Sequence, residues 1–243
     1  MFFAICLMSD GVSLSSFLEV WSVKKFRLSR RNLISAGVVT GVTGISATSS
    51  ATAGERKVTL SQTEGPFYPI IEQTDKDTDL TRYGDRDVRA LGDVVLVVGR
   101  VLNEEGAPVE DAVVDIWQAN AAGRYAHEKD PNPAPLDPNF QTWAIMTTSA
   151  DGGYGFRTIK PGAYPVEPDW TRPPHIHIKV SKRGYRELTT QMYFPGDPLN
   201  DVDRLLNEAP EDRRGDLIAK PESLRGDPDT DTLLRFDVVL AKI

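Results

Sequence analysis

The chain has 243 residues, a formal net charge of −7, and 40% hydrophobic residues. This length allows one large or two small domains with a sizeable core, and the acidic balance argues against nucleic acid as a partner. Its single cysteine, Cys6, excludes an intramolecular disulfide. We therefore expect the fold to depend on its apolar core or on a metal.

Residues 1–53 have the pattern of a cleavable export signal. Five Lys and Arg side chains lie between residues 24 and 31, an uncharged Gly-rich apolar run follows at 33–45, and small residues at 51–53 form a cleavage pattern. The apolar run is shorter than the roughly 20 residues that span a bilayer. We expect this segment to be removed, and to act as a membrane anchor only if it is not cleaved.

The segment 29–34, Ser-Arg-Arg-Asn-Leu-Ile, resembles a twin-arginine signal. It predicts a periplasmic or extracellular protein that meets the membrane only during export. Because a charged signal region normally begins near the start of a chain, we expect the true initiator near Val23, which would leave residues 1–22 untranslated.

Residues 54–92 are expected to form an N-terminal arm and connector, and residues 93–243 the folded domain. Apolar runs bounded by Gly, Pro, Asn and Asp predict short strands, and 119–141 is predicted to be a long loop. The predicted strands are 94–102, 109–118, 143–148, 154–159, a strand that begins at His175, 189–194 and 233–240. One short helix is expected at 202–208. The pattern predicts an all-β fold, an antiparallel β-sandwich with long functional loops.

The sequence Pro173-Pro174-His175-Ile176-His177 carries the clearest chemical signal in the chain. The prolines hold the backbone extended. Because successive strand side chains point to opposite faces, His175 and His177 share one face, with Cα atoms roughly 6.5–7 Å apart. Two imidazoles at that separation can bind one metal ion. The alternative is a half-exposed polar face that binds nothing.

Two histidines leave a metal short of ligands, and the sequence offers two ways to complete the site. His127, the only other histidine, would give a zinc or cupin-like iron site with His175 and His177. Tyr125 and Tyr164, which lie in loops beside Gly or Pro, are the second possibility. Because the pKa of tyrosine is about 10, it binds as a phenolate only to a strongly charged cation such as ferric iron.

Five segments together resemble the intradiol ring-cleavage dioxygenases, and the likeness runs in order from about Gln62 to the C-terminus. Within that family it is closest to the iron-binding β chains of protocatechuate 3,4-dioxygenases. The segments are Asp-Ile-Trp-Gln-Ala-Asn-Ala-Ala-Gly-Arg-Tyr at 115–125, Leu-Asp-Pro-Asn-Phe at 136–140, Phe-Arg-Thr-Ile-Lys-Pro-Gly-Ala-Tyr-Pro at 156–165, Arg-Pro-Pro-His-Ile-His at 172–177, and Gln-Met-Tyr-Phe-Pro-Gly-Asp-Pro-Leu at 191–199.

The resemblance implies a non-haem Fe(III) enzyme of aromatic catabolism. It would use O2 to cleave a small catechol-type substrate between the two hydroxyl-bearing carbons, giving a muconate-type diacid. The implied iron ligands are two tyrosinates and two histidines, with solvent as the fifth ligand: Tyr125, Tyr164, His175 and His177. The implied catalytic residues are Tyr164 as a base, Arg172 as a stabiliser of negative charge on the ring, and Gln191 as a hydrogen-bonding pocket residue. His127 would be an ordinary loop residue.

Two departures from the family pattern affect what the resemblance implies. Val166 stands where an aromatic residue follows the Tyr-Pro of the ligand loop, which argues against recognition of a carboxylated ring. Residues 54–92 leave little room for the helical dimerisation segment of catechol 1,2-dioxygenases. The protocatechuate enzymes pair their iron-bearing chain with an iron-free partner, and the resemblance implies a homo- or hetero-oligomer. The alternative function is a non-catalytic transthyretin-like or carbohydrate-binding β-sandwich module, which would need neither Tyr125 nor Tyr164.

Overall fold

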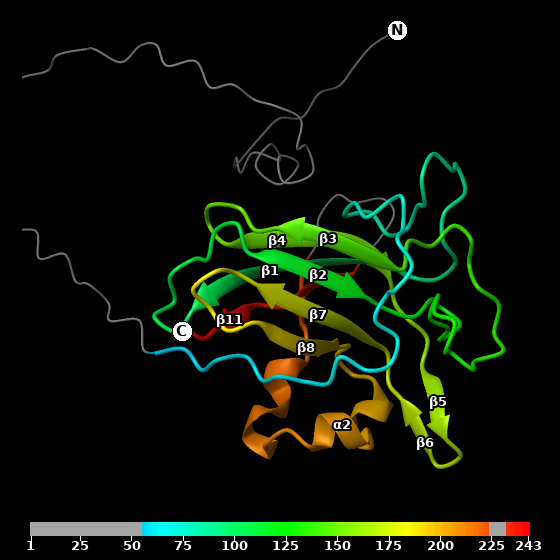
Figure 1. Cartoon of the computed structure of the whole chain (residues 1–243). Coiled ribbons are helices and arrows are strands. Elements are labelled where there is room, and N and C mark those ends of the chain that lie inside the picture. Colours follow the sequence, from blue (N-terminus) through cyan, green and yellow to red (C-terminus); the bar gives the residue numbers. More distant parts are fainter. Residues whose placement is uncertain (1–54, 224–231) are drawn as a thin grey trace, which may run out of the picture. The chain divides into compact units, whose positions relative to one another are not determined.

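The computed structural model describes residues 55–223 and 232–243 (Figure 1). The predicted export signal at 1–53 lies outside these ranges. Within them, no helix has both the length and the apolar character needed to cross a membrane.

The first sheet is built around the long strand β1 (Val94–Asn103). Strand β4 (Gly153–Ile159) pairs with it antiparallel. Two C-terminal strands, β10 (Leu233–Arg235) and β11 (Val238–Leu240), pair with it parallel, and β9 (Lys220–Glu222) adds to β10 antiparallel.

The second sheet has four strands in the order β3-β2-β7-β8, and every pairing is antiparallel. Its strands are β2 (Val113–Trp117), β3 (Trp143–Thr147), β7 (His175–Ser181) and β8 (Leu188–Tyr193). The central strand β7 places His177 opposite Trp117 on one side and Gln191 on the other. The histidine strand therefore lies inside the sheet, where its neighbours fix its position.

In the described part of the chain, a small hairpin and three short helices lie near the start of β7 (Figure 1). The hairpin pairs β5 (Tyr164–Glu167) with β6 (Trp170–Arg172), and its register shifts at Val166. The helices are η2 (Pro198–Asp201), α2 (Arg204–Asn207) and η3 (Glu211–Leu217). Helix α2 lies beside the hairpin, because Trp170 Nε1 donates to the capping carboxylate of Asp203 at 3.1 Å.

One apolar core joins the two larger sheets. Val97 and Phe156 enter it from the first sheet, Ile116 and Ile178 from the second, and all four side chains are fully buried. Each such side chain contributes roughly 1.5–3 kcal/mol through burial. The alternation of buried and half-exposed residues along β4 shows how each strand presents one face to this core.

The prediction of a mostly-β fold with several antiparallel pairings is confirmed, but five details differ. The parallel pairing of β1 with the C-terminal strands was not predicted, because residue patterns do not reveal strand direction. The expected strand 233–240 is interrupted between β10 and β11. There the backbone amide of Arg100 donates to the side chain of Asp237, at 2.9 Å, and not to a backbone carbonyl of a continuous strand. The return strand begins at Val113, and the 164–172 hairpin was missed. The predicted helix at 202–208 exists as the shorter α2.

Candidate metal centre and active site

Three separate segments bring the predicted ligands together. His175 and His177 begin β7, Tyr125 comes from the long loop after β2, and Tyr164 is the first residue of β5. The two histidines and Tyr125 are buried, and Tyr164 is partly buried.

The four side chains form one cluster. The Tyr125 hydroxyl lies 3.3 Å from His175 Nε2 and 3.2 Å from His177 Nε2. The Tyr164 ring centroid is 5.6 Å from that of Tyr125 and 5.7 Å from that of His175. Two phenol groups and two imidazoles that are far apart in the sequence therefore lie together in the structure.

A hydrogen bond orients the His175 ring, and stacking on a tryptophan orients the His177 ring. His175 Nδ1 lies 2.7 Å from the carbonyl oxygen of Pro173, so this nitrogen carries the proton and Nε2 keeps its lone pair toward Tyr125. The His177 ring stacks on the Trp117 indole, with centroids 4.8 Å apart and planes at 5°. Both imidazoles therefore present Nε2 to the same point.

Burial sets the protonation of the cluster. It lowers the pKa of His177 to about 3, and burial together with the Arg172 charge moves the pKa of His175 well below its ordinary value. Burial raises the pKa of Tyr125 and of Tyr164. At neutral pH the imidazoles are neutral and able to bind a metal, whereas the phenols release their protons only to a strongly charged cation.

Two glycines allow the tyrosine-bearing loops to pack backbone against backbone. A Cβ on Gly123, whose φ is +74°, would lie 2.4 Å from the carbonyl oxygen of Ala163. A Cβ on Gly162 would lie 2.5 Å from the carbonyl oxygen of Ala121. No larger residue fits at either position without moving a loop, so the spacing between the tyrosines depends on both glycines.

Arg172 is buried beside the cluster and is fixed at three points. Its Nε donates to Asp203 Oδ1 at 2.9 Å, and its Nη2 donates to Gln191 Oε1 at 2.6 Å and to the Tyr193 hydroxyl at 3.0 Å. Gln191 in turn donates to the carbonyl oxygen of Thr63 at 2.8 Å. The guanidinium therefore has one orientation, set by a carboxylate, an amide and a phenol.

A cleft of about 240 Å³ opens onto this arrangement. Tyr164, Arg172 and His177 line it, together with apolar side chains from the hairpin and from α2. Gln191 is not among its lining residues and lies behind Arg172. A role for Gln191 in catalysis remains a prediction.

His127 takes no part in the cluster. Its Nδ1 accepts the backbone amide of Lys129 at 3.1 Å, and the residue lines a different groove. In 55–223 and 232–243, no three His, Cys, Asp or Glu side chains come together to hold a metal. The zinc or cupin-like site on His127, His175 and His177 is therefore wrong, because its third ligand lies on another surface.

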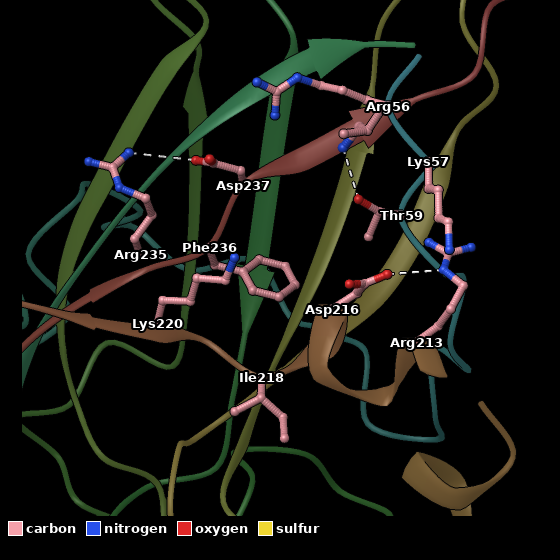
Figure 2. Close-up of a pocket in the computed structure, with 11 residues that line it drawn as sticks. Arg56, Lys57, Thr59, Arg213, Asp216, Ile218, Lys220, Arg235, Phe236 and Asp237 are labelled. Atoms are coloured by element: carbon pink, nitrogen blue, oxygen red, sulfur yellow. Dashed lines mark hydrogen bonds and ion pairs between the residues drawn. The ribbon is translucent and has the colours of Figure 1, made fainter. Parts of the chain in front are cut away.

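A second hollow, of about 310 Å³, is lined by several cations but does not resemble a catalytic site (Figure 2). Arg213 pairs with Asp216 at 3.0 Å, and Arg235 pairs with Asp237 at 3.6 Å. No tyrosine or histidine lines it.

Sequence reasoning missed two residues that organise the site. Trp117 was not singled out from the sequence, although it is opposite His177 in the sheet and stacks on its ring. Asp203 was not singled out, because a lone acidic residue in an acidic segment gives no signal of the arginine it binds. The alternation of side chains along β2 and β7 would place Trp117 on the same face as His177, but only if the register between the two strands were known.

Comparison with known proteins agrees with this geometry. The Dioxygenase_C family model, described as a dioxygenase, matches residues 63–242. The beta chain of protocatechuate 3,4-dioxygenase from Burkholderia cepacia is 44% identical over 167 residues, covering 68% of this chain and 71% of that protein. Catechol 1,2-dioxygenase 2 from Acinetobacter lwoffii is 33% identical over 168 residues, covering 61% of this chain and 55% of that protein.

Among solved structures, 3-chlorocatechol 1,2-dioxygenase from Rhodococcus opacus 1CP superimposes with a TM-score of 0.60 at 26% identity, covering 76% of this chain and 73% of that one. The non-catalytic binding module considered as an alternative is not supported, since these relatives and this neighbour are ring-cleaving dioxygenases. The family match and the shared fold lead to one conclusion: the chain belongs to the Dioxygenase_C family and is an intradiol ring-cleaving dioxygenase.

Proposed function

We propose that the protein is a non-haem Fe(III) enzyme that uses O2 to cleave a catechol-type ring between its hydroxyl-bearing carbons, giving a muconate-type diacid. The observation that carries this proposal is the convergence of two phenols and two imidazoles beside a cleft that also contains a buried arginine.

The donor set fits Fe(III) better than a divalent ion. Two phenolates would supply the negative charge that stabilises a trivalent cation, and two neutral imidazoles would add nitrogen ligands. The residues that would hold the iron are Tyr125, Tyr164, His175 and His177. When bound there, Fe(III) would withdraw electron density from a chelated catechol and make its ring reactive toward O2.

Tyr164 is the tyrosine placed to move a proton. It lines the cleft, whereas Tyr125 does not, and it is less buried than Tyr125. A catechol that enters the cleft would bring its hydroxyl groups to the Tyr164 oxygen first. We assign the Tyr164 phenolate as the base that accepts one catechol proton.

Arg172 is placed to stabilise negative charge that develops on the substrate ring. It lines the cleft, and its three hydrogen bonds fix the guanidinium before a substrate arrives. In this proposal Gln191 acts through Arg172 as a positioning residue, because its amide oxygen accepts from that guanidinium.

A visible spectrum combined with one pair of variants tests the proposal. The purified protein should contain iron, be red from tyrosinate-to-iron charge transfer, and consume O2 with a catechol. Tyr164→Phe should change the colour and depress turnover, whereas Tyr83→Phe, which removes a hydroxyl that lies 3.4 Å from Thr74 Oγ1 and outside the cleft lining, should do neither. A colourless, iron-free protein that does not turn over any catechol would contradict the proposal.

Two further properties are proposed from the sequence. The twin-arginine-like segment 29–34 supports export, and an Arg30→Lys, Arg31→Lys variant should leave the protein in the cytoplasmic fraction. The exposed Ile70, Ile71 and Leu91 side chains of the N-terminal arm support a homo- or hetero-oligomer, since a second chain would remove such apolar side chains from water. Light scattering of the purified protein would give the mass of the assembly.

A further inference from the structure

The outer wall of the active-site cleft is apolar. Val166 lies at the register shift of the β5–β6 hairpin, lines the cleft, and is 49% exposed. Trp170 from β6 and Leu205 from α2 line the same cleft, as does Phe67. A substrate ring that enters past these residues meets hydrocarbon and indole surface on its outer side.

The charged residues that line the cleft do not favour an anion. They are Asp130 and Arg172, and Arg172 is already paired with the fully buried Asp203 at 2.9 Å and lies beside the metal-ligand cluster, where its charge acts on the reacting ring. Asp130 is held in place by the backbone amides of Tyr125 and Asn132, at 2.6 and 2.9 Å. Within the described part of the chain, the cleft lining therefore offers a fixed carboxylate and no spare cation.

Arg204, a cation near the cleft, is also paired. Arg204 lies over the Trp170 ring at 5.1 Å, where it could reach a substrate carboxylate. It forms ion pairs with Glu167 at 2.7 Å and Asp169 at 2.9 Å, both on the hairpin. The rim therefore places two carboxylates against one guanidinium.

We infer that this cleft selects catechols without a carboxylate, either unsubstituted or bearing a small apolar substituent that packs on Val166, Trp170 and Leu205. A ring carboxylate would lose water in an apolar cleft without finding a partner, and it would approach Asp130. An apolar group would instead gain from leaving water. This inference rests on the proposed function, and it departs from the substrate in the name of the 44% identical relative.

The first test compares 4-methylcatechol with protocatechuate, which carries a carboxylate in place of the methyl group. For the iron-loaded full-length protein in its native assembly, kcat/KM should be at least about tenfold higher for 4-methylcatechol. Equal values, or a preference for protocatechuate, would overturn the inference.

Binding separates this inference from the proposed function. Calorimetry with the same two compounds should give tighter binding of 4-methylcatechol, whether or not the preparation turns over. If no catechol is cleaved, the proposed function fails, while the order of the two affinities still decides the inference. Tighter binding of protocatechuate would reject it.

A charge introduced at the cleft mouth gives the sharpest contrast. Val166→Lys should raise the ratio of kcat/KM for protocatechuate to that for 4-methylcatechol by about tenfold. Val88→Lys is the matched control, because this valine is also exposed, at 63%, and lies outside the cleft lining. An unchanged ratio in Val166→Lys, or an equal rise in Val88→Lys, would show that local charge does not set the preference.

Discussion

Arg172 and Asp203 form a buried ion pair in which the guanidinium Nε donates to Oδ1 at 2.9 Å. The other carboxylate oxygen of Asp203 accepts the backbone amide of Leu206 at 3.0 Å and so caps α2. One side chain therefore fixes both the helix at the edge of the cleft and the cation inside it.

Asp203→Asn should be strongly destabilising, by about 3–5 kcal/mol, because it leaves the Arg172 charge buried without its partner. It should also lower kcat, since a neutral amide oxygen holds the guanidinium less firmly than the carboxylate does. Urea unfolding and steady-state kinetics measure the two effects. Asp216→Asn is the control: this residue pairs with Arg213 at the surface at 3.0 Å, and its loss should cost about 0–1 kcal/mol. Equal losses of stability in the two variants would contradict the prediction.

The stacking of Trp117 on His177 predicts a selective effect on metal binding. Trp117→Leu should release the His177 ring and lower the iron content of the purified protein, in addition to costing about 3–5 kcal/mol of stability. Trp143→Leu serves as the control, because this buried tryptophan belongs to the same cluster but donates to Asp115 at 2.7 Å, away from the histidines. Both variants should be destabilised, and iron content measured by atomic absorption should fall only in the first. Equal iron contents would count against a positioning role for Trp117.

The histidine pair could be predicted because its geometry is local. Alternation along a strand is enough to place His175 and His177 on one face, and the prolines before them mark where the strand begins. The tyrosines could not be joined to them in the same way, because Tyr125 and Tyr164 lie in loops, where no periodicity fixes direction. The family resemblance predicted that both tyrosines are ligands, and the structure shows that they lie in the same cluster as the histidines.

The fold also has parts that can be predicted from local sequence and parts that cannot. The strands at 94–103 and 153–159 follow from their apolar patterns, since each needs only its own residues to be recognised. The parallel pairing of β1 with β10 and β11 depends on a partner far along the chain. Asp203 illustrates the same limit within the site, since its role depends on Arg172, which is distant in sequence.

Gly162→Ala should separate the two tyrosine-bearing loops. The added methyl group would lie 2.5 Å from a backbone oxygen, so one loop must move, and the distance between the phenols should change with it. We expect a shifted visible band, a lower kcat and a loss of stability of about 1–3 kcal/mol. Gly215→Ala is the matched control, because a Cβ at Gly215 meets no other atom within 4 Å. A normal spectrum in Gly162→Ala would mean that the loops adjust without disturbing the cluster.

Asp115 predicts a pH dependence of stability that is independent of the metal centre. Its carboxylate is buried and accepts from the Tyr68 hydroxyl at 2.8 Å and from Trp143 Nε1 at 2.7 Å. Burial outweighs these hydrogen bonds and raises the pKa of Asp115 above its ordinary 3.8. As the pH rises from 3.8, the unfolded chain therefore loses this proton before the folded protein does, and the free energy of unfolding falls until the pH exceeds the raised pKa.

Asp115→Asn removes this titration, so the free energy of unfolding of the wild type minus that of the variant should decrease as the pH rises from about 4 to about 6. Urea unfolding at several pH values measures it. Asp151→Asn is the control, because hydrogen bonding to Ser149 lowers the pKa of Asp151 below 3.8 and its contribution is lost only as the pH falls below that value. The corresponding difference for Asp151→Asn should stay flat between about pH 4 and 6. A flat difference for Asp115→Asn as well would mean that its two hydrogen bonds offset the cost of burying the charge.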